Sequence, residues 1–125
     1  MSLTPLTASA FDFAAEASVH PDGLNVKLVG TADMSVRAVL DEFIGKLHRA
    51  AQDQHATQVV MDFRELAFMN SSCLKRLVAW ISEIQDLPTG DRYRLVLVSS
   101  PEMHWQRRSF HALSCLGGEL VTVQS

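Results

Sequence analysis

The hydrophobic positions change period along the chain, and each period predicts one type of element. Residues 11–19 and 24–30 have the alternation typical of strands, and the turn sequence HPDG between them predicts an opening β-hairpin. Residues 57–63 and 93–100 are short apolar runs rich in β-branched side chains, which predicts two buried strands. The closing segment, 119–125, predicts a final short strand.

Between these strands, three segments have the period of an amphipathic helix. The first covers about residues 35–53, with Ser35 as its expected N-cap, and its apolar face contains Val36, Val39, Leu40, Phe43, Ile44 and Leu47. The second opens at a serine pair and ends near residues 86–91, and its apolar stripe contains Leu74, Leu77, Val78, Ile81 and Ile84.

The third helix is predicted to start with Ser100 as N-cap and Pro101 at its first position, and to stop at Gly117. The predicted order is therefore β-β-α-β-α-β-α-β. Strands alternating with helices predict one α/β domain with a mixed, mostly parallel sheet. We expect this domain to span residues 11–125 and residues 1–10 to form a flexible N-terminal tail.

Length and charge narrow the class of protein. A chain of 125 residues is the size of one domain, and a net charge of -3 with a pI near 5.9 gives no bulk attraction to nucleic acid. The N-terminus lacks a signal-peptide pattern, and no apolar run is long enough for a membrane span. With two widely spaced cysteines, we expect a cytoplasmic protein with reduced thiols.

The sequence lacks the common motifs of catalysis and cofactor binding. It has no phosphate-binding glycine loop, no GxGxxG and no GxSxG, and its five histidines include no i, i+4 pair on a helix. We therefore expect no metal and no cofactor. A catalytic serine would need a histidine base, and no histidine lies near the serine pair in the sequence.

The serine pair, Ser71 and Ser72, lies where a short loop, expected over residues 64–70, meets the second helix. One serine suffices to cap the helix, which stabilises it by about 1 kcal/mol. The other is then free at a helix end that favours an added anion such as a phosphate. On local grounds alone, capping is the simpler interpretation. Cys73 is interpreted as a buried packing residue, with a reactive thiol as the alternative.

Three segments in order resemble the STAS domain, the fold of bacterial anti-sigma factor antagonists. They are LVGTAD (28–33), VVMDFRELAFMNSSCLKRLV (59–78) and VLVSSPEMHWQRRSFHALSCLGG (96–118). The second is similar to the family pattern of a strand, a short apolar loop and Asp-Ser-Ser/Thr-Gly-Leu at the start of a helix. The resemblance covers about residues 11–124.

The resemblance implies a regulatory, non-enzymatic module that binds a protein partner. Ser71 takes the place of the serine phosphorylated by an anti-sigma factor kinase, Ser72 that of its capping neighbour, and Asp33 that of the aspartate that contacts the partner. A phosphatase would reverse the switch. The partner's identity and the oligomeric state stay open.

Two departures from the pattern support a second interpretation. Asn70 stands where the family has Asp, and Cys73 where it has Gly. Lys75 and Arg76 place cations in the first helical turn, where they either lie in solvent or meet an anion such as a phosphoserine or an acidic partner. The alternative is a constitutive STAS subunit of a sensory or lipid-transport complex, without a phospho-switch.

A separate cluster lies on the third helix and contains His104, Arg107, Arg108 and His111. It is predicted to form a charged solvent face, with Trp105 packed inward beside it. The alternative is a second contact surface, because Trp and Arg are over-represented at interfaces.

Overall fold

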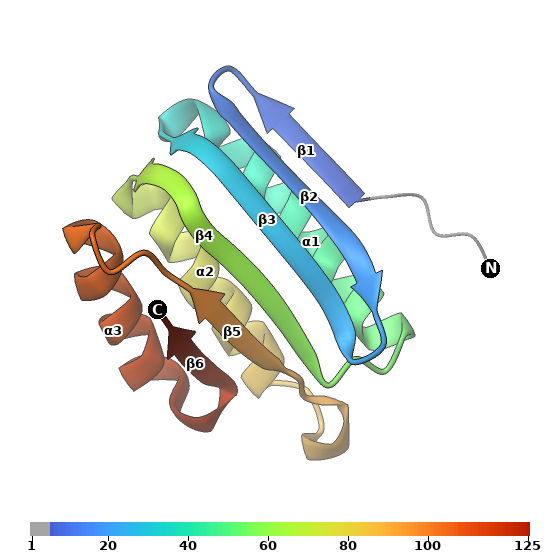
Figure 1. The fold of residues 1–125 in the computed structure, drawn as a ribbon. Helices are drawn as coiled ribbons and strands as arrows, with labels where there is room; N and C mark the ends of the chain where they lie inside the picture. Colours follow the sequence, from blue (N-terminus) through green and yellow to red (C-terminus); the bar gives the residue numbers. More distant parts are fainter. Residues whose placement is uncertain (1–5) are drawn as a thin grey trace.

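Six strands form one mixed sheet, in which they follow one another in chain order (Figure 1). The computed structural model describes residues 6–125. The strands are β1 (Leu6–Ala10), β2 (Phe13–His20), β3 (Gly23–Ala32), β4 (Gln58–Met69), β5 (Arg94–Val98) and β6 (Val121–Gln124). The first three are antiparallel, and β3 to β6 are parallel. From β2 onward, the predicted order of elements is confirmed.

Strand β1 corrects the predicted tail. Its residues pair with β2 from Leu6↔Ala17 to Ala10↔Phe13. The sequence LTASA contains mostly small residues, so its alternation is too weak to predict a strand. In the fold, Leu6, Ala8 and Ala10 pack against the core, and the backbone ladder to β2 holds the rest. Residues 1–5 of the predicted tail lie outside the described residues.

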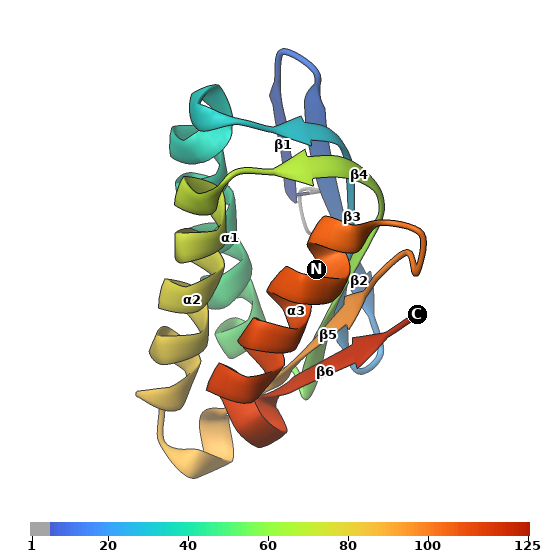
Figure 2. The same ribbon diagram turned by 90° about the vertical axis from the view of Figure 1, so that its left-hand side faces the viewer.

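Three helices cover one face of the sheet (Figure 2). They are α1 (Arg37–Asp53), α2 (Ser71–Gln85) and α3 (His104–Gly117), with the short 3-10 turns η1 (Met34–Val36), η2 (Thr89–Asp91) and η3 (Gly118–Leu120). The helix faces predicted from periodicity supply much of the core, including Leu40, Phe43, Ile44, Leu47, Leu77, Ile81 and Ile84.

Helix ends differ most from the prediction. Helix α1 begins after η1, whose N-cap is Asp33 rather than Ser35. Helix α3 begins at His104, because residues 100–103 form a turn, closed by a hydrogen bond from the Met103 N–H to the Ser100 carbonyl. The helix ends at Gly117 as predicted, and the residue after it, Gly118, is its C-cap, with a φ of 58°.

Strand β4, with 12 residues, is much longer than the strand predicted over residues 57–63. It continues through the expected loop to Met69, paired with β3 through two register shifts. These irregularities, and the two consecutive charged residues Arg64 and Glu65, break the alternation of apolar and polar positions that would have predicted a strand. Because β5 pairs only with Gln58–Asp62, the last part of β4 has no strand partner on that side.

The buried amide of Gln106 on α3 replaces this missing partner. Its Nε2 donates to the carbonyl oxygens of Phe63 (2.6 Å) and Leu66 (3.1 Å) on β4. Its Oε1 accepts from the backbone N–H of Ser100 at 2.7 Å. One fully buried side chain therefore joins β4, α3 and the loop that follows β5.

The turn between β1 and β2 packs against β3 at Gly30, which gives a first prediction. Gly30 has a φ of 99°, and a Cβ atom there would lie 2.1 Å from the carbonyl oxygen of Asp12. We expect Gly30→Ala to lower the free energy of unfolding by about 2–4 kcal/mol. The matched control is Gly45→Ala within α1, where a Cβ meets nothing within 4 Å and should stabilise by up to about 1 kcal/mol. Urea denaturation of both variants checks this, and equal effects would contradict it.

A partly buried hydrogen-bond network joins α1, α2 and the residue just before β5. The indole Nε1 of Trp80 donates to the hydroxyl of Tyr93 at 2.7 Å, and that hydroxyl contacts Nδ1 of His48. Since the tyrosine oxygen already accepts from the indole, its proton donates to a neutral imidazole. Burial lowers the pKa of His48, while nearby Glu83 raises it and Arg76 lowers it.

This hydrogen-bond network predicts a loss of stability in mild acid. As the pH falls through about 6.5, His48 binds a proton in the unfolded chain before it does so in the folded protein. The free energy of unfolding should therefore decrease below that pH and level off once the pH is below the folded pKa. His48→Gln keeps an acceptor without titrating, and should flatten this part of the profile. Denaturation midpoints measured between about pH 5 and 8 test it, and identical profiles would contradict it.

Candidate functional site

The serine pair lies at the carboxyl ends of two neighbouring parallel strands. Strand β4 ends at Met69, opposite Ala32 at the end of β3, and the N–H of Asn70 donates to the Ala32 carbonyl at 2.9 Å. Helix α2 starts at once with Ser71. The structure therefore brings Ser71 to the edge of the sheet where the loop after β3, with Asp33, also emerges (Figure 1).

Asn70, and not Ser72, caps helix α2. The side-chain Oδ1 of Asn70 accepts from the N–H of Cys73 at 2.9 Å, which corrects the predicted division of labour between the serines. The cause is the length of β4: the helix follows it directly, so the residue before Ser71 occupies the capping position. Asn is as strong an N-cap as Ser, and that was the signal in the sequence.

The two serines differ in what surrounds them. Ser71 is exposed, and no hydrogen bond within residues 6–125 occupies its hydroxyl. Ser72 is half-buried, and its Oγ accepts from Nη1 of Arg37 at 3.0 Å. The same nitrogen donates to the Ser72 carbonyl at 2.7 Å. Sequence reasoning missed Arg37, because only the packing of α1 beside α2 brings it there.

Asp33 is an exposed carboxylate beside this helix end. Its Oδ1 accepts from both the N–H and the hydroxyl of Ser35, and these hydrogen bonds hold the pKa of Asp33 below its ordinary value. Cys73 lies behind it, fully buried, with its Sγ 3.5 Å from the Asp33 carbonyl oxygen. The complete burial of its side chain confirms the packing interpretation of Cys73, and this burial also raises the pKa of the thiol.

Lys75 and Arg76 have separate environments. Arg76 is only 8% exposed, and it forms ion pairs with Asp41 (3.0 Å) and Glu83 (3.4 Å). The predicted role of Arg76 in partner binding is therefore wrong, because its guanidinium is buried against carboxylates of the same chain. Lys75 is exposed, has no ion pair within residues 6–125 and lies four residues after Ser71, hence on the same side of α2.

Exposed apolar side chains occur at the same edge of the sheet. Met34 follows β3 and is 72% exposed, and Phe68 near the end of β4 is 46% exposed. Phe11, in the turn between β1 and β2, is 94% exposed. A hydrogen bond from the Thr31 N–H to the Asp12 carbonyl holds this turn against the end of β3. Apolar groups that face water near an accessible serine are typical of a protein-binding surface.

The charged cluster on α3 has only local contacts among the described residues. Arg107 donates to the Pro101 carbonyl at 2.9 Å, and His111 lies 3.7 Å from the thiol of Cys115. His104 and Arg108 are exposed, while Trp105 packs partly buried against the core. The prediction of a charged face with an inward-packed tryptophan is confirmed, and a contact surface there stays a prediction.

Nothing in residues 6–125 resembles a catalytic or metal centre around the serines. No group of three potential metal ligands occurs there, and no histidine in this part of the chain hydrogen-bonds to either serine. None of the described helices is long and apolar enough to cross a membrane.

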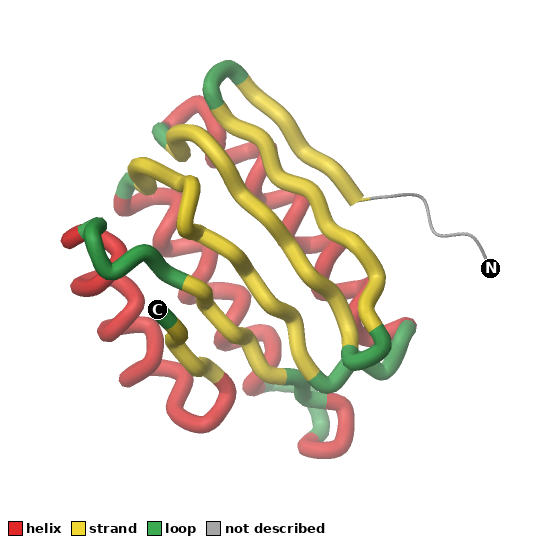
Figure 3. The backbone as a smooth tube through the Cα atoms, in the orientation of Figure 1, coloured by secondary structure: helices red, strands yellow, loops and turns green. Residues whose placement is uncertain are grey.

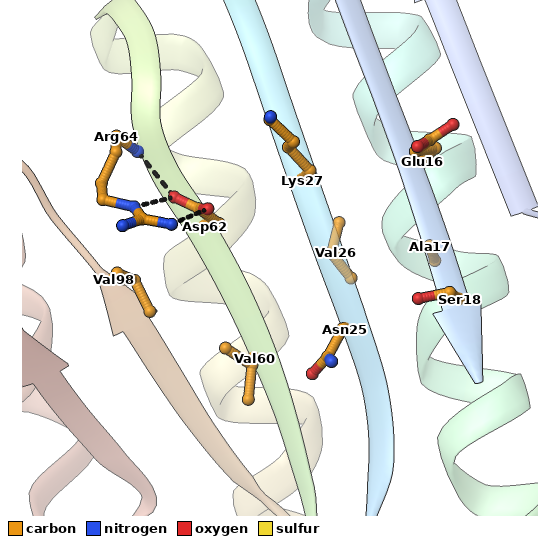
Figure 4. A pocket seen from close by; sticks show the side chains of 10 residues that line it. All are labelled: Glu16, Ala17, Ser18, Asn25, Val26, Lys27, Val60, Asp62, Arg64 and Val98. Carbon is orange, nitrogen blue, oxygen red and sulfur yellow. Dashed lines mark hydrogen bonds and ion pairs between the residues drawn. The ribbon is translucent and has the colours of Figure 1, made fainter. Parts of the chain in front are cut away.

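A shallow hollow of about 440 Å³ lies on the uncovered face of the sheet (Figure 4). Neither a histidine nor a cysteine lines it. One of its two carboxylates, Asp62, is bound by Arg64 through two side-chain hydrogen bonds of 2.8 and 3.0 Å, and this contact lowers the pKa of Asp62. Lys27 is paired with Glu65 at 2.6 Å. Lys27, Asp62 and Arg64 are thus paired, whereas the exposed carboxylate of Glu16, which also lines the hollow, has no ion pair within residues 6–125.

Neither a search against models of protein families nor a search of curated proteins finds a match. Solved structures do match. An anti-sigma factor antagonist from Mycobacterium paratuberculosis has a TM-score of 0.64 at 17% identity, covering 92% of this chain and 89% of that one.

Two further structures are those of the anti-sigma factor antagonist SpoIIAA. The unphosphorylated form gives a TM-score of 0.60 at 19% identity, covering 89% of this chain and 88% of that one. The phosphorylated form, described as a Bacillus cell fate determinant, gives 0.59 at 18% identity, covering 89% and 91%. This chain is one α/β domain, with its helices packed on one face of the sheet (Figure 3). The chain therefore has the STAS fold of the anti-sigma factor antagonists.

Proposed function

We propose that this chain is a regulatory protein-binding module of the anti-sigma factor antagonist type, switched by phosphorylation of Ser71. The partner is a serine kinase that also acts as an anti-sigma factor, a phosphatase reverses the modification, and the exchange takes place in the cytoplasm. One observation carries the proposal. Among the polar side chains of Asn70, Ser71 and Ser72, that of Ser71 alone is exposed without a hydrogen bond within residues 6–125.

The unmodified surface is suited to docking. It combines exposed apolar groups, Met34 and Phe68, with the ionised Asp33 and the exposed Lys75. Apolar anchors surrounded by charges are a common composition of transient interfaces. Arg76 is not included in this surface, because its guanidinium is buried in intramolecular ion pairs.

A phosphate on Ser71 would change this surface in two ways. It adds a charge of about -1.5 to -2, which must be desolvated or repelled when a partner docks. Within the chain it is stabilised by the free N–H groups at the start of α2 and by Lys75 one turn along. The folded state therefore accommodates the phosphate, while the complex does not.

The test is capture of the partner under two conditions. The unmodified chain, immobilised and mixed with extract from its own organism, is expected to hold a kinase when Mg²⁺ is chelated and to release it when Mg²⁺ and ATP are added. Ser71→Ala should hold the kinase under both conditions. Release of the kinase from Ser71→Ala to the same extent would contradict the proposal.

The constitutive subunit remains the second candidate. It is favoured by Cys73, whose buried side chain fills the space between α2 and the Asp33 loop and would stiffen the docking edge. This function predicts a partner that stays bound with or without ATP, to both the unmodified chain and Ser71→Ala.

A further inference from the structure

Arg37 connects two helices at the proposed switch. It is the first residue of α1, and its Nη1 reaches the first turn of α2, where it donates to the carbonyl oxygen of Ser72 at 2.7 Å and to the Oγ at 3.0 Å. The serine beside it, Ser71, has no such contact. Of two adjacent hydroxyls at one helix end, the one on Ser72 is therefore held by a hydrogen bond and the one on Ser71 is not.

The position of the Arg37 side chain is itself fixed. Its Nε donates to Oδ1 of Asp41, one turn along α1, at 3.1 Å. The same oxygen is 3.0 Å from Nε of Arg76, which also pairs with Glu83. A planar guanidinium held on one side by a carboxylate presents its other nitrogens in a defined direction. The network thus aims Nη1 of Arg37 at Ser72.

We propose that Arg37 determines which serine accepts the phosphate, by keeping Ser72 out of the reaction. This inference rests on the proposed function. In the phosphoryl transfer, a serine Oγ bonds to the γ-phosphorus of ATP, the bond from that phosphorus to the bridging oxygen breaks and ADP leaves. The hydroxyl proton passes to a base of the kinase.

The contact opposes this step at Ser72 in two ways. The N–H of Arg37 occupies a lone pair of the Oγ that would attack phosphorus, and Arg37 cannot take up the serine proton because it stays protonated. The contact also points the hydroxyl toward α1, into a half-buried position away from an incoming nucleotide. Arg37 is therefore a positioning residue, and the accessible Ser71 is the sole acceptor.

The experiment removes the preferred acceptor first. Each variant is produced in the chain's own organism, and its phosphosites are mapped by mass spectrometry. Ser71→Ala is expected to carry no phosphate above background. Ser71→Ala/Arg37→Ala should gain phosphate on Ser72, at least about tenfold above Ser71→Ala, because a freed hydroxyl regains its nucleophilicity.

Two control variants make this specific. Ser71→Ala/Arg49→Ala removes an exposed cation elsewhere on α1 and should stay unphosphorylated. Ser71→Ala/Arg37→Lys keeps one donor near Ser72 and should suppress most of the gain. If Ser72 stays unmodified without Arg37 while Ser71 is phosphorylated in the unaltered chain, the inference fails and the proposed function stands. If the unaltered chain has no phosphate on Ser71, both fail.

A second measurement needs no kinase. Melting temperatures of Arg37→Ala, Ser72→Ala and the double variant form a double-mutant cycle. The decreases in melting temperature are expected to be non-additive: the decrease for the double variant should be smaller than the sum of the two single decreases. Strict additivity would show that the Arg37–Ser72 contact carries no coupling, and would overturn the inference.

Discussion

Replacing Gln106 with leucine is expected to lower the free energy of unfolding by about 3–5 kcal/mol, although the size of the side chain hardly changes. The amide of Gln106 is fully buried and serves Phe63, Leu66 and the N–H of Ser100. Leucine leaves these three backbone groups without that partner. Each buried, unpaired group costs about 1–3 kcal/mol, offset in part by the gain from burying leucine.

The matched control is Gln52→Leu on the exposed side of α1, which should change stability by no more than about 0.5 kcal/mol. Urea denaturation followed by far-UV circular dichroism measures both. The account of β4 would be contradicted if the two variants were equally stable. It would also be contradicted if Gln106→Leu left the protection of the Ser100 amide against hydrogen exchange unchanged.

The second large effect is on binding. Ser71→Asp is expected to weaken the complex with the captured kinase by at least about 100-fold, since a like or unpaired charge at an interface costs several kcal/mol. The loss should come without unfolding, because a carboxylate in the first turn of α2 interacts favourably with the helix dipole. The melting temperature should therefore stay the same or rise.

Ser82→Asp is the control for this measurement. Ser82 is exposed on the same helix but lies three turns farther along, away from the carboxyl ends of β3 and β4. In isothermal titration with the kinase, Ser82→Asp should bind with the same affinity as the unaltered chain. Equal affinities for Ser71→Asp and the unaltered chain would favour the constitutive subunit.

The sequence predicted the elements that have a strong periodic pattern. The faces of α1 and α2 and the buried strands β4 and β5 follow from apolar side chains repeated at the right spacing. It did not predict β1, because small residues such as Ala8 and Ala10 carry little hydrophobic signal and are held mainly by backbone pairing.

The sequence predicted the main residues of the candidate site, but not the contacts that surround them. Ser71 and Asp33 were singled out through the resemblance to the STAS family, and the structure places both at one edge of the sheet. The roles of Asn70 and Arg37 depend on where β4 ends and on how α1 packs beside α2. The Arg37–Ser72 contact joins residues 35 positions apart, and no local pattern records it. Asn70 was a possible N-cap by residue type, but its role depended on where β4 ends.

The most direct test of the switch is the phosphorylation state of the chain in two pools from its own cells: free chain and chain bound to its partner. Intact-mass measurement and site mapping are applied to each pool. The account predicts one phosphate, on Ser71, in the free pool and none in the bound pool. Phosphate on Ser71 in equal amounts in both pools, or in neither, would contradict it.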